Sequence, residues 1–165
     1  MNAVKLVDAK PMLDAFFKNL FDNTNKRIMS AARHGVSEAI NAIMNRTKQN
    51  VSSSWFNATS SAGRTMRGYT YNRPLIEGVQ AYMYKGMATG FVHIMGTPRT
   101  NDGTWRLRMF EGGTRKRKSK HGKDYGSLRP TWFFSNAVSS VGSDAVTMIQ
   151  DSISAAIDEI NHSNG

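Results

Sequence analysis

The chain of 165 residues is 39% hydrophobic, which suffices for one domain with a modest core. It contains no cysteine, so disulfides and thiolate metal sites are excluded. Of the net charge of +10, a balance of +7 lies between residues 99 and 129, where ten Lys and Arg stand against three Asp and Glu. Such a localised field attracts polyanions or an acidic protein surface.

The first predicted element is a helical region over residues 12–50, after an extended segment that ends at Pro11. Apolar residues recur here at steps of three and four, the spacing of an amphipathic helix. One helix of this span would be about 55 Å long, whereas a compact chain of this size is about 40 Å across. We therefore expect a break at residues 22–25, which are Asp, Asn, Thr and Asn. The alternative is an unbroken helix that projects and packs on a neighbouring subunit.

The middle of the chain combines a long loop with strands. Residues 51–74 are rich in Ser, Asn and Gly and predict a loop, whose aromatic residues should dock on something. Residues 75–110 predict a β-meander with antiparallel strands at 75–84, 89–95 and 104–110. In the last strand Arg106 and Arg108 alternate with apolar residues, so we expect both arginines on the face turned toward solvent, a partner or DNA.

A basic loop at residues 111–130 and a C-terminal helix at residues 131–161 complete the chain. Apolar residues from Phe134 to Ile160 form an unbroken helical stripe, so residues 132–161 should be one long helix that crosses the sheet. Gly142 would allow close packing within it. The expected fold is α+β, a single domain over 1–165 with long N-terminal and C-terminal amphipathic helices packed on a small antiparallel β-sheet.

Patterns that carry catalytic or metal chemistry are missing from the sequence. The four histidines lack metal-ligand spacing, the glycines near Lys116 lack the spacing of a phosphate-binding loop, and no serine lies in Gly-x-Ser-x-Gly. We therefore predict no enzyme activity, no cofactor and no metal. The first residues carry charges where a signal peptide needs apolar residues, and no apolar run reaches about 18 residues. We expect a soluble protein that is not secreted.

One stretch resembles a known family. Phe110-Glu111-Gly112-Gly113-Thr114 leads into a polar loop, and Leu128-Arg129-Pro130-Thr131-Trp132-Phe133-Phe134 then opens an amphipathic helix. This order resembles the head–tail joining, tail-completion or neck proteins of tailed bacteriophages, which include the minor tail protein Z type. The segment at residues 62–67 loosely resembles the signature that follows the long helix in the same family. The resemblance spans residues 12–160, and the basic loop and residues 51–72 depart from the family pattern.

The resemblance implies a structural virion protein made in the host bacterial cytoplasm. It would form a closed cyclic homo-oligomer in the neck, a hexamer by expectation, and join the tail to the DNA-filled head as a tail terminator. Its partners would be itself, neighbouring neck or connector proteins and the tail tube. Two other classes stay open, a stand-alone basic nucleic-acid-binding protein and a nuclease or other enzyme.

Nine residues are candidate contacts with a partner or with DNA. The basic loop would either line the DNA channel or reach an acidic face of a neighbouring ring, and we favour the protein face because a channel that conducts DNA should not grip it. Glu111 is expected to be an interfacial salt-bridge partner, as the family pattern implies, or a surface acid at a strand end. The nine candidates are Arg106, Arg108, Glu111, Arg115, Lys116, Arg117, Lys118, Lys120 and Lys123.

Overall fold

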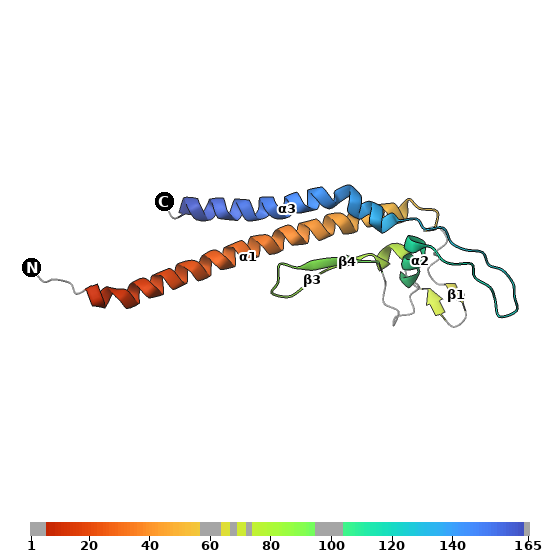
Figure 1. Ribbon diagram of the computed structural model, residues 1–165, viewed down its shortest axis with the longest axis horizontal. Helices are drawn as coiled ribbons and strands as arrows, with labels where there is room; N and C mark the ends of the chain where they lie inside the picture. The colour runs from red at the N-terminus through yellow and green to blue at the C-terminus, as the bar shows by residue number, and fades with distance from the viewer. Residues whose placement is uncertain (1–5, 57–63, 67–68, 72–73, 95–103, 164–165) are drawn as a thin grey trace, which may run out of the picture.

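The computed structural model describes residues 6–56, 64–66, 69–71, 74–94 and 104–163. Two long helices and short antiparallel strands give the α+β fold that the sequence predicts (Figure 1). In chain order the elements are α1 (Leu6–Ser52), β1 (Arg64–Met66), β2 (Tyr69–Tyr71), the 3-10 helix η2 (Leu75–Gly78), β3 (Gln80–Met83), β4 (Gly90–His93), the 3-10 helix η4 (Thr104–Arg106), α2 (Leu107–Gly112) and α3 (Phe133–Ser163).

The two long helices pack side by side and antiparallel. The side chain of Asn50, near the end of α1, donates a hydrogen bond to the carbonyl of Phe133 at the start of α3, at 2.9 Å. Further along, Ser152 donates to the carbonyl of Ala31, also at 2.9 Å. The apolar stripe of α3 therefore faces α1, and the prediction that this helix crosses the sheet was wrong.

Helix α1 runs unbroken from Leu6 to Ser52, about 70 Å at 1.5 Å per residue. The predicted break at residues 22–25 was wrong, and residues 6–11 are helical rather than extended, while residues 1–5 lie outside the described residues. Asp, Asn and Thr each cost less than about 0.7 kcal/mol in a helix, too little to interrupt a stripe that keeps its phase on both sides. The N-terminal part of α1 extends past the end of α3, as the projecting alternative required (Figure 1).

The β3–β4 hairpin lies against α1. Its register pairs Gln80 with His93 and Met83 with Gly90. A Cβ on Gly90 would lie 2.9 Å from the Cδ1 atom of Ile40, so the hairpin approaches α1 closely at this point. The predicted strand at 75–84 is shorter than expected, because residues 75–78 form η2 instead. Of the predicted strand at 89–95, residues 90–93 form β4, and residue 95 lies outside the described residues.

Two further sequence predictions in this region were wrong. The 51–74 segment contains a small antiparallel pair, β1–β2, so it is not loop throughout. The predicted third strand at 104–110 is helical, as η4 and α2. Leu107 and Phe110 are buried three residues apart, which is a helical step, while Arg108 is exposed. The alternation at residues 105–109 predicted a strand, but the buried residues Leu107 and Phe110 fit one face of a helical turn.

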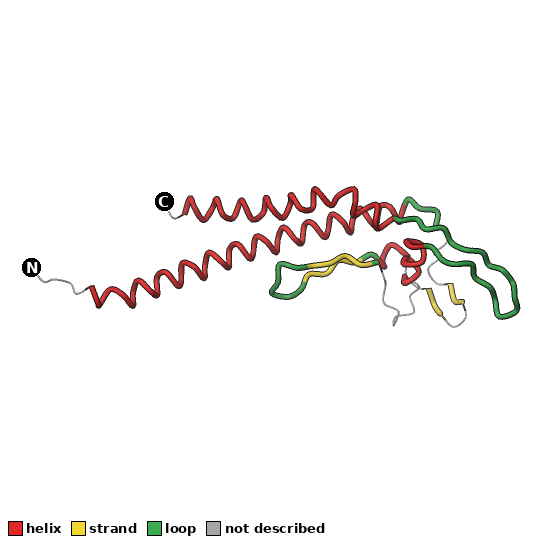
Figure 2. The backbone as a smooth tube through the Cα atoms, in the orientation of Figure 1, coloured by secondary structure: helices red, strands yellow, loops and turns green. Residues whose placement is uncertain are grey.

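The core lies where α1 ends, α2 passes and α3 begins. Phe56 is fully buried there and stacks on Phe110, with ring centroids 4.4 Å apart and ring planes 13° apart. The ring centroid of Phe133 lies 5.5 Å from that of Phe56. We expected aromatic residues after α1 to pack against another surface, and Phe56 does so against Phe110 of the same chain. This core holds both ends of the segment that carries the basic residues. Figure 2 shows that the segment between these ends reaches beyond the ends of both helices.

Candidate functional site

Residues 114–128, which we name the basic arm, form an irregular antiparallel hairpin. At its base the backbone N–H of Thr114 donates to the carbonyl of Leu128 at 3.0 Å. Halfway along, Arg117 and Tyr125 are joined by a 2.8 Å backbone hydrogen bond, and Ser119 donates to the carbonyl of Lys123 at 2.8 Å. The cations that the sequence assigned to a loop are therefore carried on a hydrogen-bonded hairpin.

Short polar residues and glycines shape the tip of the basic arm. The hydroxyl of Ser119 accepts hydrogen bonds from the backbone N–H groups of His121 and Lys123, at 3.2 and 3.0 Å. Gly122 has φ of 79°, in the left-handed region that favours glycine. A Ser side chain that bonds backbone groups a few residues ahead, followed by a left-handed Gly, is typical of a tight turn.

The base of the basic arm is tied to the start of α3 through Glu111. Its carboxylate accepts hydrogen bonds from the backbone N–H groups of Phe134, at 2.8 Å, and Ser135, at 3.0 Å. The hydroxyl of Ser135 also donates to it at 2.6 Å. Glu111 lies in α2, so its assignment to a strand end was wrong, and its carboxylate caps the N-terminus of α3. Contact of Glu111 with a partner stays a prediction.

The basic arm has a strongly positive surface. It contains six Lys and Arg and one acid, Asp124, which gives a net charge of +5 (six minus one). All six cationic side chains are exposed: Arg115, Lys116, Arg117, Lys118, Lys120 and Lys123. Because exposed charges of one sign on a narrow hairpin repel one another, this arrangement favours a negatively charged partner.

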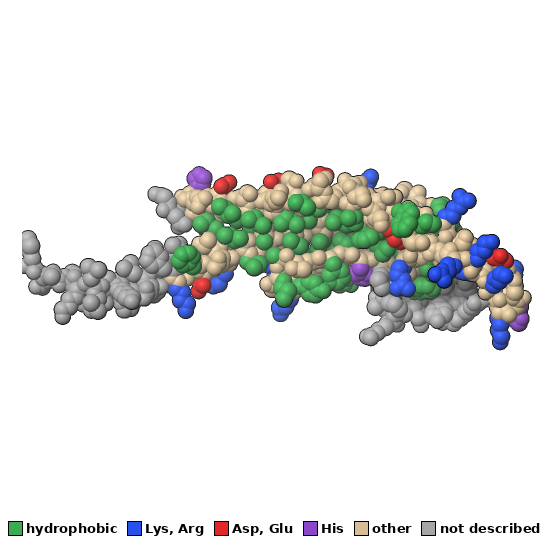
Figure 3. Space-filling model, viewed as in Figure 1, with side chains coloured by type: hydrophobic (Ala, Val, Ile, Leu, Met, Phe, Trp, Pro, Cys, Tyr) green, Lys and Arg blue, Asp and Glu red, His purple; other side chains and the backbone are tan. Residues whose placement is uncertain are grey.

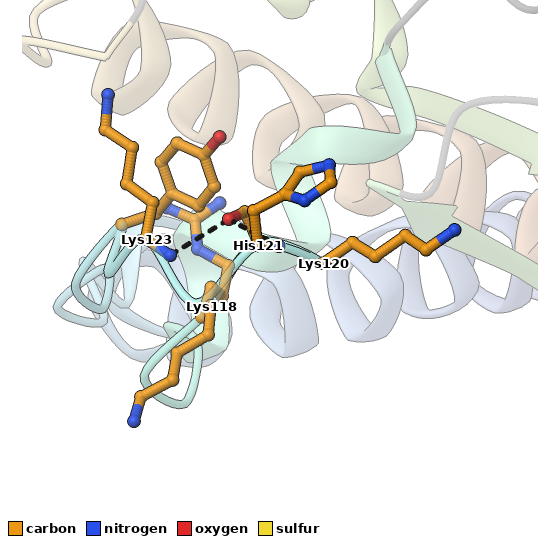
Figure 4. Close-up of a pocket in the computed structure, with 7 residues that line it drawn as sticks. Lys118, Lys120, His121 and Lys123 are labelled. Carbon is orange, nitrogen blue, oxygen red and sulfur yellow. Dashed lines mark hydrogen bonds between the residues drawn. The ribbon is translucent and has the colours of Figure 1, made fainter.

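Several of these side chains surround one concave surface near the tip, of about 840 Å³ (Figure 4). Lys118, Lys120 and Lys123 extend in different directions from the backbone, with His121 between them. The Nζ atom of Lys123 lies 5.9 Å from the ring centre of Tyr125, within the range of a cation–π contact. The surface is lined by Arg117, Lys118, Ser119, Lys120, His121, Lys123 and Tyr125.

The remaining cationic candidates lie outside this concave surface. Arg115 and Lys116 belong to the basic arm but sit closer to its base. Arg108 is exposed on α2, and Arg106 is half-buried in η4. Since neither lies on a strand, the predicted sheet face with two arginines does not exist.

The described residues were compared with two further kinds of site, a metal site and a membrane-spanning helix. Among the side chains that the structure describes, those of residues 18, 21–56, 74–94 and 104–163, no three His, Asp or Glu come together as metal ligands would. None of the described helices has the length and apolar character that crossing a membrane requires.

Sequence reasoning missed an aromatic face on the β3–β4 hairpin. The ring of Tyr82 stacks on Phe91 at 5.6 Å and on His93 at 5.3 Å. Burial lowers the pKa of His93 from the ordinary value of 6.5. The signal was present in the sequence, because aromatic residues alternate at positions 82, 84, 91 and 93, counting His as aromatic.

No family model, no curated protein and no solved structure matches the chain. The resemblance to phage neck proteins therefore depends on the quoted sequence segments, and the function that it implies is a proposal.

Proposed function

We propose that the protein is a structural subunit of a tailed bacteriophage that assembles into a closed ring in the neck and joins the tail to the DNA-filled head. The observation that carries the proposal is the unburied apolar surface of the two long helices. Phe21 on α1 is 64% exposed, and Val146 and Ile157 on α3 are 55% and 41% exposed. Figure 3 shows apolar side chains gathered in a broad band over both helices.

Two helices packed together bury only the stripes that face each other. An amphipathic layer needs a second layer on its other apolar surface, and soluble monomers rarely leave a large contiguous apolar patch uncovered. In a ring, a neighbouring subunit covers this surface. The exposed apolar band therefore favours self-association over a monomeric role.

The position of the basic arm suits a joining role. It extends away from the helices at one end of the elongated molecule (Figure 1). An arm on each subunit of a ring would form a circle of cationic contacts, available to a neighbouring connector, tail tube or genome. In this proposal the protein acts in the virion and has no catalytic step.

Mass measurement tests the proposal most directly. Purified protein is expected to form one closed species, a hexamer by the family expectation, and electron micrographs should show rings. In virions the protein should occur in multiples of six, and particles without it should accumulate as separate heads and tails. A strictly monomeric species in purified protein and in virions would contradict the proposal.

The basic arm also favours a second candidate function, a stand-alone nucleic-acid-binding protein. Its net charge of +5 and the exposed Tyr125 are features of non-specific phosphate and base contacts. Such binding would be independent of sequence and would weaken with salt, with a slope of about 0.9 per phosphate neutralised. A monomer that binds DNA in this manner would favour the second candidate over the ring.

A further inference from the structure

Helix α3 has an acidic side that has no role in either proposed function, the ring subunit or the nucleic-acid-binding protein. Its residues 133–163 include four acids and no Lys or Arg. Asp144, Asp151 and Asp158, which we name the acidic ridge, follow at intervals of seven residues and are all exposed. Seven residues are close to two helical turns, so the three carboxylates lie along one side of α3 over about 21 Å. Figure 3 shows acidic side chains along the edge of α3 that points away from α1.

The acidic ridge is not neutralised within the described part of the chain. The close contacts between basic and acidic side chains found there join Arg27 to Glu159 at 3.3 Å and His34 to Glu38 at 3.4 Å, and neither includes a ridge residue. Asp144 accepts one long hydrogen bond, of 3.5 Å, from the hydroxyl of Ser143. The ridge therefore carries three negative charges that a cationic partner could neutralise.

The chain contains its own cationic partner, but one molecule cannot bring the two together. The basic arm begins beside the N-terminus of α3 and extends beyond that end of the helix (Figure 1). The acidic ridge runs from Asp144 in the opposite direction, toward Ser163. Contact between arm and ridge thus requires two copies.

We propose that the basic arm of one copy docks on the acidic ridge of a second copy. This inference rests on the proposed ring, for which it names one contact between subunits. The segment at residues 115–118, which leads to the turn, carries four of the six cations of the arm and spans about 13 Å, enough to lie along two neighbouring carboxylates of the ridge, which are about 10 Å apart. The charges are opposite in sign, so the same field that repels a second basic arm attracts this helix.

The geometry of this contact also bears on closure. The arm and the ridge are different surfaces of one chain, so their contact is heterologous and each copy can use both at once. Heterologous contacts generate rings when the rotation closes and filaments when it does not. A nucleic acid would satisfy the arm but leave the ridge without a role, and for this reason we favour the second copy.

Paired charge reversals test the docking on the full chain. One variant reverses the arm (R115E/K116E/R117E/K118E), and the other reverses the ridge (D144K/D151K/D158K). Native mass spectrometry and sedimentation at about 50 mM salt, where exposed charges are weakly screened, should show at least tenfold weaker self-association for each variant alone. An equimolar mixture should assemble again, because each reversed surface then meets an opposite charge.

The control reverses four exposed cations outside the arm (K18E/K26E/R46E/K85E), which changes the net charge by the same amount as the arm variant. This control should assemble like the wild type. Circular dichroism should show unchanged helix content in all variants. If a reversed chain loses helix, the neutral set R115Q/K116Q/R117Q/K118Q replaces it and should weaken association in a salt-dependent manner.

Failure of the docking can be told apart from failure of the proposed ring. Reversed variants that assemble like the wild type, or that stay apart when mixed, would overturn the docking and leave the ring standing. A wild-type chain that is monomeric at every concentration would overturn both. An arm variant that keeps its assembly but no longer binds a short DNA duplex would assign the arm to nucleic acid and overturn the docking.

Discussion

The carboxylate of Glu111 accepts hydrogen bonds from both the backbone N–H and the hydroxyl of Ser135, at 3.0 and 2.6 Å. Together with its bond to the N–H of Phe134, it ties α2 to the first turn of α3. Glu111 thus holds the base of the basic arm, because the arm connects these two helices. The acid that the family resemblance singled out has a structural role within the chain.

Replacement of Glu111 by Ala should lower the free energy of unfolding by about 1–2 kcal/mol, since the first N–H groups of α3 lose their acceptor. Gln should cost less, because its amide oxygen can still accept a hydrogen bond. Urea denaturation followed by circular dichroism measures both. Glu159→Ala on the same helix is the control, since its exposed pair with Arg27 contributes at most about 1 kcal/mol. Equal losses for Glu111→Ala and Glu159→Ala would contradict the capping role.

The glycines of the two long helices, Gly35 and Gly142, should respond to Ala in opposite directions. A Cβ on Gly35 would lie 2.8 Å from the Cα atom of Ile149, so Gly35→Ala should push α1 and α3 apart and destabilise the fold. A Cβ on Gly142 would meet nothing within 4 Å in the described part of the chain. The expected close packing at Gly142 was therefore wrong, and Gly142→Ala should stabilise by up to about 1 kcal/mol through helix propensity.

Thermal unfolding of the two variants makes this comparison. Gly35→Ala should melt below the wild type and Gly142→Ala above it. A rise in melting temperature for Gly35→Ala would show that the helices do not cross as closely as the structure indicates.

The neighbouring aromatic residues Trp55 and Phe56 should differ strongly in their contribution to stability. Phe56 is fully buried and stacked on Phe110, so Phe56→Ala should cost about 3–5 kcal/mol. Trp55 is 61% exposed and contacts the core rings only at their edges, so Trp55→Ala should cost clearly less. Urea midpoints for the two variants give the comparison, and a larger loss for Trp55→Ala would contradict the placement of this segment in the core.

The sequence predicted the two long helices because their apolar spacing continues over many turns. It failed where a pattern was short. Five alternating residues at 105–109 fit a strand, but Leu107 and Phe110 also fit one buried helical face, and packing against Phe56 favours the helix. The hydrogen bonds of the basic arm were equally hidden, since they join backbone groups and short polar side chains and leave no apolar period.

The sequence predicted which residues make up the candidate site, but not the hairpin conformation that carries them. A count of Lys and Arg located the basic segment, whereas the turn at Ser119 and Gly122 that folds it into a hairpin needed the structure. The acidic ridge was available in principle, from Asp at positions 144, 151 and 158 without a nearby Lys or Arg. Its significance depends on the direction of the basic arm, which no local pattern encodes.

The histidine on the aromatic face should make stability depend on pH. Burial lowers the pKa of His93 in the folded chain, so the unfolded chain binds more protons just below pH 6.5. The stability that buried His93 contributes is present above pH 6.5 and is lost as the pH falls through the lowered pKa of His93 in the folded chain. When the pH is lowered from about 8 to about 5, the free energy of unfolding should fall less for His93→Phe than for the wild type. Urea midpoints at the two pH values test this, with His121→Phe on the exposed basic arm as the control.

The exposed apolar band leads to the last prediction, which concerns Val146 and Ile157. Both side chains are exposed, at 55% and 41%. The double change V146S/I157S should therefore leave the stability of a single copy within about 0.5 kcal/mol of the wild type. Burial of such side chains at an interface contributes about 1.5–3 kcal/mol each, and about 1.4 kcal/mol corresponds to tenfold in affinity, so self-association should weaken by more than tenfold.

Sedimentation velocity over a concentration series measures this association, and urea denaturation checks the fold. The control changes two exposed serines of the same helix (S143A/S154A), which lie about 60° around the helix axis from Val146 and Ile157 and should leave association unchanged. If V146S/I157S assembles as the wild type does, a neighbouring copy does not cover this part of α3. If the variant unfolds more easily without a change in mass, Val146 and Ile157 act within one chain, and the exposed band loses its value as support for the ring.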